Sequence, residues 1–286
     1  MSADQCRLLA AAFPTLGFGP ICCNTTMTFC ENGVLTQLSL GSLNIGGQIP
    51  YELGSLNTLV NLALFNNSFT STIPESLGNL TKLEYLSLDT NHLTGGIPSS
   101  FANLVNLKEL WLYTNNLTGP IPPFVGNMRN LRNLSLDDNR FSGQIPDTIG
   151  QLKNLVFLGL TRNELSGQIP TSIGSIPTLT KLHFGNNFLN GSLPYTLNPT
   201  VVTECDGRGT LVCINATAMP DVGRYCNLAF CQDTFSRPQF SRLPPIIGSI
   251  VSSLLLLYAL VSFSLAIRFK KPKGIVRTLS FKRTSK

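Results

Sequence analysis

A chain of 286 residues has room for one or two ordinary domains, so its length alone decides little. Charged residues make up 13% of it, about half the usual share. The formal net charge of +6 suggests nucleic-acid binding, but eight positive charges lie within the last 19 residues. The rest of the chain carries 13 basic and 15 acidic side chains, a net charge of −2. This distribution argues against a nucleic-acid-binding surface on the body of the protein.

Residues 1–34 are expected to form an N-terminal cap. Asp4 is placed to cap a short helix with one apolar face, and Pro14 is expected to end it, because proline disfavours helical geometry in the preceding residue. The apolar face comprises Leu8, Leu9, Ala12 and Phe13. The opening MSADQCRLLAAAFP has neither the basic region nor the apolar core of a signal peptide. An export signal is therefore expected to precede Met1 in the complete protein.

The eight cysteines fall into two groups of four, with none in the 174 residues between the groups. They are Cys6, Cys22, Cys23 and Cys30, then Cys205, Cys213, Cys226 and Cys231. No CxxC motif or ligand histidine accompanies either group, so disulfides in an oxidising compartment fit better than a metal site. We expect two disulfides in each group and none between the groups. Four cysteines allow three pairings, which the spacing leaves open.

Between the cysteine groups, residues 35–198 repeat every 24 residues without an insertion. The seven units begin at Leu35, Leu59, Leu83, Leu107, Leu131, Leu155 and Leu179. The third, LEYLSLDTNHLTGGIPSSFANLVN, shows the pattern LxxLxLxxN that is typical of leucine-rich repeats. Leu86 and Leu88 lie two residues apart, so both point to the same side of a short strand and into the coil. One coil leaves both its faces open, so stability is expected to grow as coils stack.

The ninth position of six units is an asparagine. These residues are Asn67, Asn91, Asn115, Asn139, Asn163 and Asn187, and the first unit has Leu43 instead. A side-chain amide both donates and accepts hydrogen bonds, so it can pair backbone groups that would otherwise be buried without partners at the turn after the strand. We therefore expect these asparagines to be structural.

The second cysteine group falls within residues 199–245, which are expected to form a C-terminal cap and a juxtamembrane linker. Residues 246–267 read IIGSIVSSLLLLYALVSFSLAI, which are 22 residues without a charge. As a helix they would span about 33 Å, enough to cross a hydrocarbon core of about 30 Å. The alternative, a buried globular helix, rarely runs so long without a polar stripe. Because basic residues are retained in the cytoplasm, the basic tail 268–286 is expected inside and the repeats outside.

The segments LTGGIP, LTGPIP, FSGQIP and LSGQIP belong to an LxGxIPxxLGxL half-unit that resembles the plant-specific class of leucine-rich repeats. This class includes receptor-like kinases, receptor-like proteins and polygalacturonase-inhibiting proteins, and the resemblance covers residues 4 to about 198. It implies an α/β repeat fold, a right-handed solenoid with a concave parallel β-sheet, a small extra sheet near the LxGxIP segments and disulfide-bonded caps. It also favours the pairs Cys6–Cys22 and Cys23–Cys30. One C-terminal transmembrane helix and a short tail without a kinase resemble a receptor-like protein.

The chain departs from this class in both caps. The segment CCNTTMTFC lacks the tryptophan that usually precedes the last cysteine of the first cap. The cysteine spacing of the second cap is not typical of the class, so the resemblance implies no pairing there. A specific plant immune or developmental role is therefore not carried over.

The sequence contains no phosphate-binding glycine loop, metal-binding motif or nucleophile motif. Its two histidines, His92 and His183, occupy surface positions of the repeat. We therefore expect no enzymatic activity, no cofactor, no metal and no nucleic-acid partner. Seven N-x-S/T sequons are candidate glycosylation sites: Asn24, Asn66, Asn79, Asn116, Asn133, Asn190 and Asn215.

The residues between the strand leucines are expected to point outward on the concave side, where the repeat does not dictate their identity. Aromatic and acidic residues concentrate there in units two to six, around the only tryptophan. The predicted ligand contacts are Phe65, Tyr85, Asp89, Glu109, Trp111, Tyr113, Asp137 and Phe157. Exposed tryptophan and tyrosine are enriched at interaction hot spots. The alternative interpretation is that large side chains simply pack against one another along the sheet.

These features predict a single-pass plasma-membrane receptor-like protein. It would bind an extracellular peptide, glycan or protein on the concave face and signal through a kinase-bearing co-receptor. The alternative is a membrane-tethered hydrolase inhibitor or wall-adhesion protein that does not signal.

Overall fold

The computed structural model describes residues 2–20, 22–23, 25–198, 200–214 and 226–231. The chain divides into two units, Met1–Cys231 and Gln232–Lys286, and all described residues belong to the first. The predicted transmembrane helix 246–267 and the basic tail therefore lie outside the described residues. Within the described ranges, no helix has both the length and the apolar character needed to cross a membrane.

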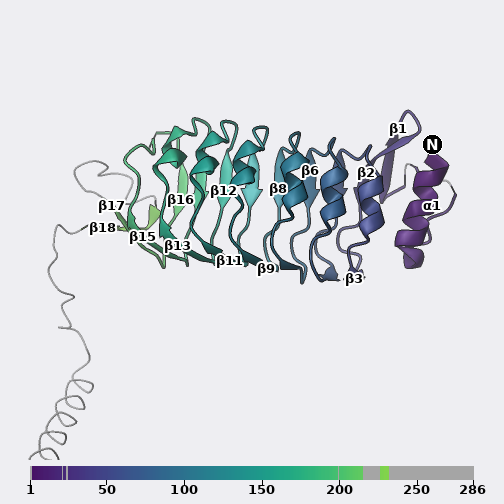
Figure 1. The fold of residues 1–286 in the computed structure, drawn as a ribbon, viewed down its shortest axis with the longest axis horizontal. Helices are drawn as coiled ribbons and strands as arrows, with labels where there is room; N and C mark the ends of the chain where they lie inside the picture. The colour runs from purple at the N-terminus through teal and green to yellow at the C-terminus, as the bar shows by residue number, and fades with distance from the viewer. Residues whose placement is uncertain (1, 21, 24, 199, 215–225, 232–286) are drawn as a thin grey trace, which may run out of the picture. The chain divides into compact units, whose positions relative to one another are not determined.

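Each of the seven predicted repeat units supplies one strand to a long sheet. These strands are β2 (Val34–Ser39), β4 (Asn61–Ala63), β6 (Tyr85–Ser87), β8 (Glu109–Trp111), β10 (Asn133–Ser135), β12 (Phe157–Gly159) and β14 (Lys181–His183). They pair in parallel, and the register advances by one unit at each step, so that Leu86 lies beside Leu110. The parallel sheet implied by the repeat is confirmed, and its strands follow one another in chain order (Figure 1).

The caps extend this sheet to nine strands. In the first cap, β1 (Thr28–Glu31) pairs antiparallel with β2. In the second cap, β16 (Glu204–Asp206) pairs in parallel with β14. The order of the strands is β1-β2-β4-β6-β8-β10-β12-β14-β16. Both edges of the repeat sheet are therefore covered by strands that the repeat pattern did not predict.

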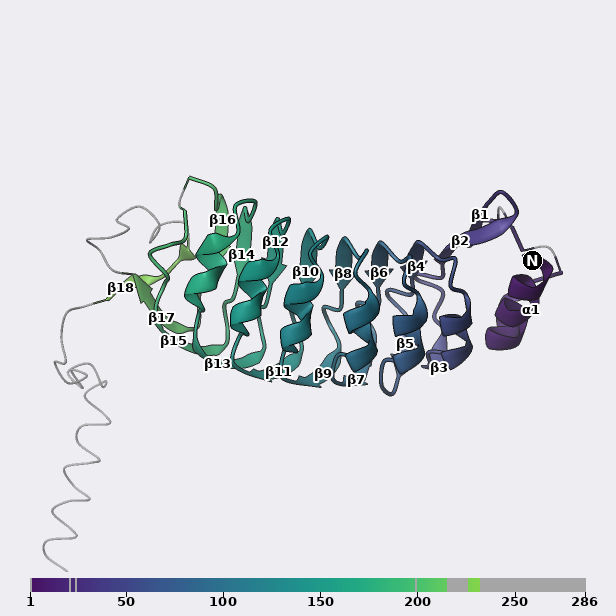
Figure 2. The ribbon, with the colours of Figure 1, turned by 45° about the horizontal axis from the view of Figure 1, so that its top comes forward.

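Short strands from the LxGxIP half-units form further parallel sheets, as the resemblance implied. β3 (Gly46–Gln48) and β5 (Ser68–Thr70) form a two-stranded sheet. A seven-stranded sheet contains β7 (Thr94–Gly95), β9 (Asn116–Gly119), β11 (Arg140–Gly143), β13 (Glu164–Gln168), β15 (Phe188–Ser192), β17 (Leu211–Ile214) and β18 (Ala229–Phe230). Figure 2 shows these strands along a different side of the coils from the long sheet.

Helical turns complete the coils. They are the five-residue 3-10 helices η2 (Tyr51–Ser55), η3 (Glu75–Asn79), η4 (Ser99–Asn103), η5 (Pro123–Asn127), η6 (Asp147–Gln151) and η7 (Thr171–Ser175). A proline lies at the N-cap of each, and the chain must return to the next strand within one 24-residue unit. The helical part of the α/β expectation is therefore corrected: the repeat coils contain 3-10 turns, whereas α1 (Ser2–Ala12) in the first cap is an α-helix.

The repeat leucines form one continuous core, in which Leu83, Leu86, Leu88, Leu93, Phe101 and Leu104 are fully buried. The asparagines of the ninth position are also buried. The amide nitrogen of Asn115 donates to the carbonyl oxygens of Leu88, Leu112 and Tyr113 at 3.0, 3.2 and 3.3 Å. Its amide oxygen accepts from the Leu93 N–H at 3.0 Å. Because Leu88 and Leu93 belong to the preceding coil, each asparagine joins two coils, which confirms its structural role.

The first cap docks on the repeats through helix α1. Leu9 and Phe13 are buried, whereas Leu8 and Ala12 are partly buried against the core. The helix begins at Ser2, which places Asp4 in the first turn and not at the N-cap. The Asp4 carboxylate lies 3.6 Å from the Arg7 guanidinium, so the expected capping role is wrong. Because the helix begins at Ser2, Asp4 lies within its first turn, where its carboxylate pairs with Arg7 one turn further along the helix surface.

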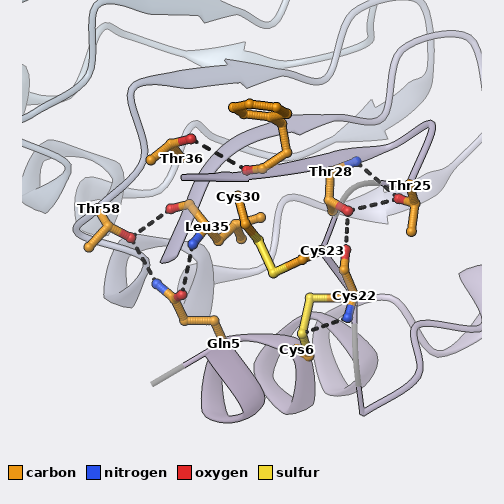
Figure 3. The surroundings of a disulfide bond; sticks show 11 residues. Gln5, Cys6, Cys22, Cys23, Thr25, Thr28, Cys30, Leu35, Thr36 and Thr58 are labelled. Atoms are coloured by element: carbon orange, nitrogen blue, oxygen red, sulfur yellow. Dashed lines mark hydrogen bonds between the residues drawn. A yellow bond between two sulfur atoms is a disulfide. The ribbon is translucent and has the colours of Figure 1, made fainter. Parts of the chain in front are cut away.

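A glutamine that the sequence did not single out connects α1 to the first coil (Figure 3). The Gln5 amide nitrogen donates to the Thr58 hydroxyl at 2.8 Å, and its amide oxygen accepts from the Leu35 N–H at 3.1 Å. The disulfides Cys6–Cys22 and Cys23–Cys30 hold the same region together. This is the pairing that the resemblance favours.

The second cap is an additional coil closed by disulfides. Cys205 lies beside Leu182 in the sheet, and its side chain is buried where the repeat has a leucine. The disulfides are Cys205–Cys226 and Cys213–Cys231, a pairing that the sequence left open. The Gly207 N–H donates to the Cys226 carbonyl oxygen at 2.8 Å. All four disulfides join cysteines of the same group, as expected.

Asn115→Ala tests the asparagine contacts. The substitution leaves the buried Leu93 N–H without its partner, which costs about 1–3 kcal/mol, and removes one of the two amide donors to the Leu88 carbonyl, which keeps that of Asn91. We expect the free energy of unfolding to fall by about 2–4 kcal/mol in a urea titration. The exposed neighbour provides the control: in unglycosylated protein, Asn116→Ala should change stability by less than about 0.5 kcal/mol. Equal losses in the two variants would contradict this role.

Candidate functional site

The third, fifth and seventh positions of each unit form the outer face of the long sheet. In units two to six these positions hold Asn61, Ala63 and Phe65; Tyr85, Ser87 and Asp89; Glu109, Trp111 and Tyr113; Asn133, Ser135 and Asp137; and Phe157, Gly159 and Thr161. They alternate with buried leucines, which places all eight predicted contact residues on one face. The aromatic members are half-buried, whereas the sequence predicted large exposed rings. They are half-buried because neighbouring strands bring their side chains into contact.

Four rings of the outer face are in contact. Trp111 and Tyr113 meet edge to face, with ring centroids 6.4 Å apart and an interplanar angle of 89°. Trp111 stacks with Phe157 at 6.0 Å and 27°, although β10 lies between their strands. Phe157 in turn meets the ring of His183 at 5.3 Å. Such pairs contribute about 0.5–1.5 kcal/mol beyond the burial of area, so packing explains part of this cluster.

A pocket of about 270 Å³ lies on the outer face, toward the first cap from Trp111. It is lined by Phe65, Tyr85, Ser87, Asp89, Trp111 and Tyr113. Five of the eight predicted contact residues therefore surround one cavity. A larger depression of about 600 Å³ lies among the LxGxIP turns of units five to seven, but no aromatic ring lines it. We therefore place the candidate site on the outer face.

Asp89, a predicted polar contact, lines this pocket with only 4% of its surface exposed. Its carboxylate accepts hydrogen bonds from the hydroxyls of Ser87, at 2.5 Å, and Thr90, at 3.3 Å. Burial, followed by the hydrogen bond to Asp89 and the charge of Asp89, raises the pKa of Tyr113 to about 12. A buried carboxylate is stable only with such donors around it.

Two other acidic residues of the predicted site are also held by neighbours. The Trp111 indole N–H donates to the Glu109 carboxylate at 2.9 Å. The Asp137 carboxylate accepts from the Ser135 hydroxyl at 2.6 Å and from the Thr161 backbone N–H at 2.7 Å. Asp137 and Phe157 do not line the pocket. Their contacts place them in the packing that supports Trp111 and its neighbours.

Asn24 and Asn215 lie outside the described residues, and the other sequons lie on the surface. Asn66, Asn79, Asn116 and Asn190 are exposed. Asn133 is half-buried on β10, between the strands of Trp111 and Phe157, and the hydroxyl of its sequon residue Ser135 bonds to Asp137. A glycan on Asn133 would therefore stand beside the stacked rings.

His92 is exposed as expected, whereas His183 is half-buried and lies 3.0 Å from the Glu204 carboxylate. His183 therefore lies at the outward position that the repeat predicts for it, but it is not exposed as expected. The contact between the rings of His183 and Phe157 joins the adjacent strands β14 and β12, so local sequence spacing does not predict it. Within the described residues, no group of three or more histidine, cysteine or acidic side chains could hold a metal ion.

The Leucine Rich Repeat family model matches residues 58–80, 82–104, 106–128 and 130–152, one stretch for each of four units. A similar solved structure is the ectodomain of the Arabidopsis thaliana membrane receptor kinase GASSHO1/SCHENGEN3 in complex with CASPARIAN STRIP INTEGRITY FACTOR 2. It is 35% identical, with a TM-score of 0.64, over 67% of this chain and 23% of that chain. No curated protein sequence matches this chain.

This chain contains a plant-type leucine-rich repeat domain. The plant peptide hormone receptor RGFR1, solved with RGF2, is 38% identical over 63% of this chain and 29% of that chain, with a TM-score of 0.60. A plant ice-binding protein is 26% identical over 74% of this chain and 72% of that chain, with a TM-score of 0.66. The chain thus spans less than a third of either receptor. The leucine-rich repeat domain is a scaffold of a typically non-catalytic kind.

Tyr113 provides a test of the pocket chemistry. The absorbance of tyrosinate in the full chain minus that in Tyr113→Phe isolates the ionisation of this residue. We expect a midpoint near pH 12, against about 10 for an ordinary tyrosine. Asp89→Asn should move the midpoint down, because it removes a charge that disfavours the phenolate. Asp137→Asn, in the same position two strands away, should leave it in place; a wild-type midpoint near 10 would contradict this geometry.

Proposed function

We propose that this chain is a receptor-like protein of the cell surface that binds an extracellular ligand on the outer face and signals through a partner. A peptide is the ligand class that the similar ectodomains favour, since GASSHO1/SCHENGEN3 and RGFR1 were solved with a bound factor and with RGF2. Glycans and folded proteins are the other classes consistent with the sequence. The ice-binding relative indicates that the scaffold also has other uses, so function depends on the site and not on the fold.

The observation that carries the proposal is the aromatic pocket. The fold requires leucines inside the coil but does not specify the outer face, yet four rings surround one cavity there. A concave site with a few converging polar groups is the usual form of a ligand pocket. Such a pocket on a sheet of nine strands can hold one side chain of a ligand that extends along the neighbouring rows.

Topology forms the second part of the proposal. The disulfides of both caps fit an oxidising compartment, and the uncharged run 246–267 precedes a basic tail. These features favour a single-pass protein with the repeats outside the cell. Intact cells that express the chain behind a signal peptide should lose the repeats to added protease and keep a tag placed after Lys286. Loss of the tag with retention of the repeats would reverse this orientation.

The binding prediction rests on Trp111. Secreted peptides captured by the full chain should bind the Trp111→Ala variant about 30-fold more weakly, because truncation of a hot-spot residue loses about 2 kcal/mol or more. Since Trp111 also packs on its neighbours, the variant should lose about 1–2 kcal/mol of stability as well. Ile149→Val, in the buried core at η6, should cause a loss of about 0.5–1.5 kcal/mol and serves as the matched control.

The control separates recognition from packing. Ile149→Val should retain full affinity at a similar stability. If both variants bind equally well, the rings are packing alone and the ligand binds elsewhere. Co-purification of a kinase-bearing protein with the liganded chain supports a receptor. Recovery of only hydrolases or wall polymers would instead favour the rival function, a tethered inhibitor or adhesion protein.

A further inference from the structure

The pocket on the outer face combines aromatic rings with a buried carboxylate. Phe65, Tyr85, Trp111 and Tyr113 supply four rings from the strands β4, β6 and β8 or the residues that follow them. Trp111 and Tyr113 stand almost perpendicular, so they form two walls that meet at an angle of 89°. The Asp89 carboxylate lies among these rings. Aromatic faces carry partial negative charge, so rings and carboxylate attract the same kind of ligand.

The acidic groups at this pocket have no cationic partner in the described part of the chain. The ion pairs there include Glu84 with Lys108 and Asp138 with Arg162, but none includes Asp89 or Glu109. Their polar contacts are hydroxyls and the Trp111 indole, which are neutral donors. The negative charge of the pocket is therefore hydrogen-bonded but not neutralised.

The negative charges near the pocket also affect the pKa values of its two tyrosines. Burial raises the pKa of Tyr85, and the charges of Asp89 and Glu109 add to this effect while a hydrogen bond with Ser87 opposes it. Burial is the largest cause of the raised pKa, and the nearby negative charges disfavour the phenolate further. The same field that disfavours an anion stabilises a cation.

We propose that this pocket binds the cationic side chain of a lysine or arginine in a peptide ligand. The inference rests on the proposed function of the outer face and assigns one ligand residue to it. An ammonium or guanidinium group between the rings gains cation–π attraction and lies near the Asp89 carboxylate. A neutral apolar group would displace water from the same carboxylate without a positive charge to compensate, so its binding would be less favourable. An anion would meet both the carboxylates and the ring faces.

Contacts around the lining residues make the pocket rigid. Phe157 does not line the pocket but stacks on Trp111 from the strand β12, on the opposite side of β8 from β4 and β6. The indole N–H is fixed by Glu109 and the Asp89 carboxylate by Ser87. A cavity with fixed walls loses less conformational freedom when a ligand enters.

The only tryptophan of the chain lines this pocket, so its fluorescence reports binding without a label. The probe is the capped tripeptide acetyl-Gly-Lys-Gly-amide, titrated into the full-length chain at constant ionic strength. The matched neutral probe replaces lysine with norleucine. We expect both lysine and arginine tripeptides to change the fluorescence, and the norleucine tripeptide to bind at least about tenfold more weakly. A glutamate tripeptide should give no response.

Two carboxylates of the outer face provide a matched pair of variants. Asp89 and Asp137 both occupy the seventh position, and each accepts a hydrogen bond from the serine two residues before it. Only Asp89 lines the pocket. Asp89→Asn should remove the preference for lysine over norleucine, whereas Asp137→Asn should retain it. If circular dichroism shows that Asp89→Asn is misfolded, Tyr85→Leu, which removes a half-buried ring, should weaken the lysine probe several-fold.

Three results would overturn the proposal. They are equal affinity for the lysine and norleucine probes, no response to the lysine probe, and equal effects of the two asparagine variants. Tighter binding of tetramethylammonium than of either basic tripeptide would overturn the assignment to a peptide side chain.

These probes require neither the natural ligand nor a signalling partner. If they fail while Trp111→Ala still weakens a captured ligand, the cation site is wrong and the proposed function stands. If they succeed while that variant binds normally, the cation site stands and the captured ligand binds elsewhere, so the proposed ligand site on the outer face is wrong.

Discussion

The structure depends on how the buried backbone groups at each turn find hydrogen-bond partners. The asparagine at the ninth position meets this need with one side chain. Its amide oxygen reaches back 22 residues and its amide nitrogen 27 residues to the preceding coil, while the nitrogen also bonds within its own coil, so one side chain connects adjacent coils. A single coil could not satisfy these groups, and a unit of different length would move the amide away from them. The hydrogen bonds thus explain why the units stack with constant register and without insertions.

Constant register in turn determines what the outer face can do. Equivalent positions form straight rows across the strands, with successive side chains of a row about 4.8 Å apart, so a large side chain must share space with its neighbours on adjacent strands. Small residues provide that space. A Cβ atom on Gly41 would lie 2.4 Å from the Phe65 ring, and one on Gly159 would lie 2.0 Å from the Asp137 carboxylate. The site is therefore built from pairs of large and small residues in adjacent units, and a ring can reach past the next strand, as Trp111 does.

The regular part of the fold could be predicted from the sequence, and the irregular part could not. The strands and the buried leucines recur in every unit and the asparagine contacts in six of the seven units, so the same signal is repeated along the chain. Gln5 has no such repetition, because its role is set by where helix α1 docks. The repeat pattern did not predict the additional coil of the second cap, because Cys205 stands where the pattern requires a leucine. For the candidate site, spacing predicted which residues share a face but not that Asp89 is buried, since burial depends on the rings of two adjacent units.

Half-burial of the aromatic residues does not by itself favour packing over binding. A ring that is free in solvent must be ordered when a ligand arrives, and each rotamer-rich side chain that is immobilised costs about 0.5–1.5 kcal/mol. Trp111 is already fixed by stacking on Phe157 and by its hydrogen bond to Glu109. The contacts that stabilise the fold therefore also reduce the cost of recognition. What distinguishes a site from simple packing is the space left over, and between the rings of units two to four that space is a pocket of about 270 Å³ with a carboxylate in its lining.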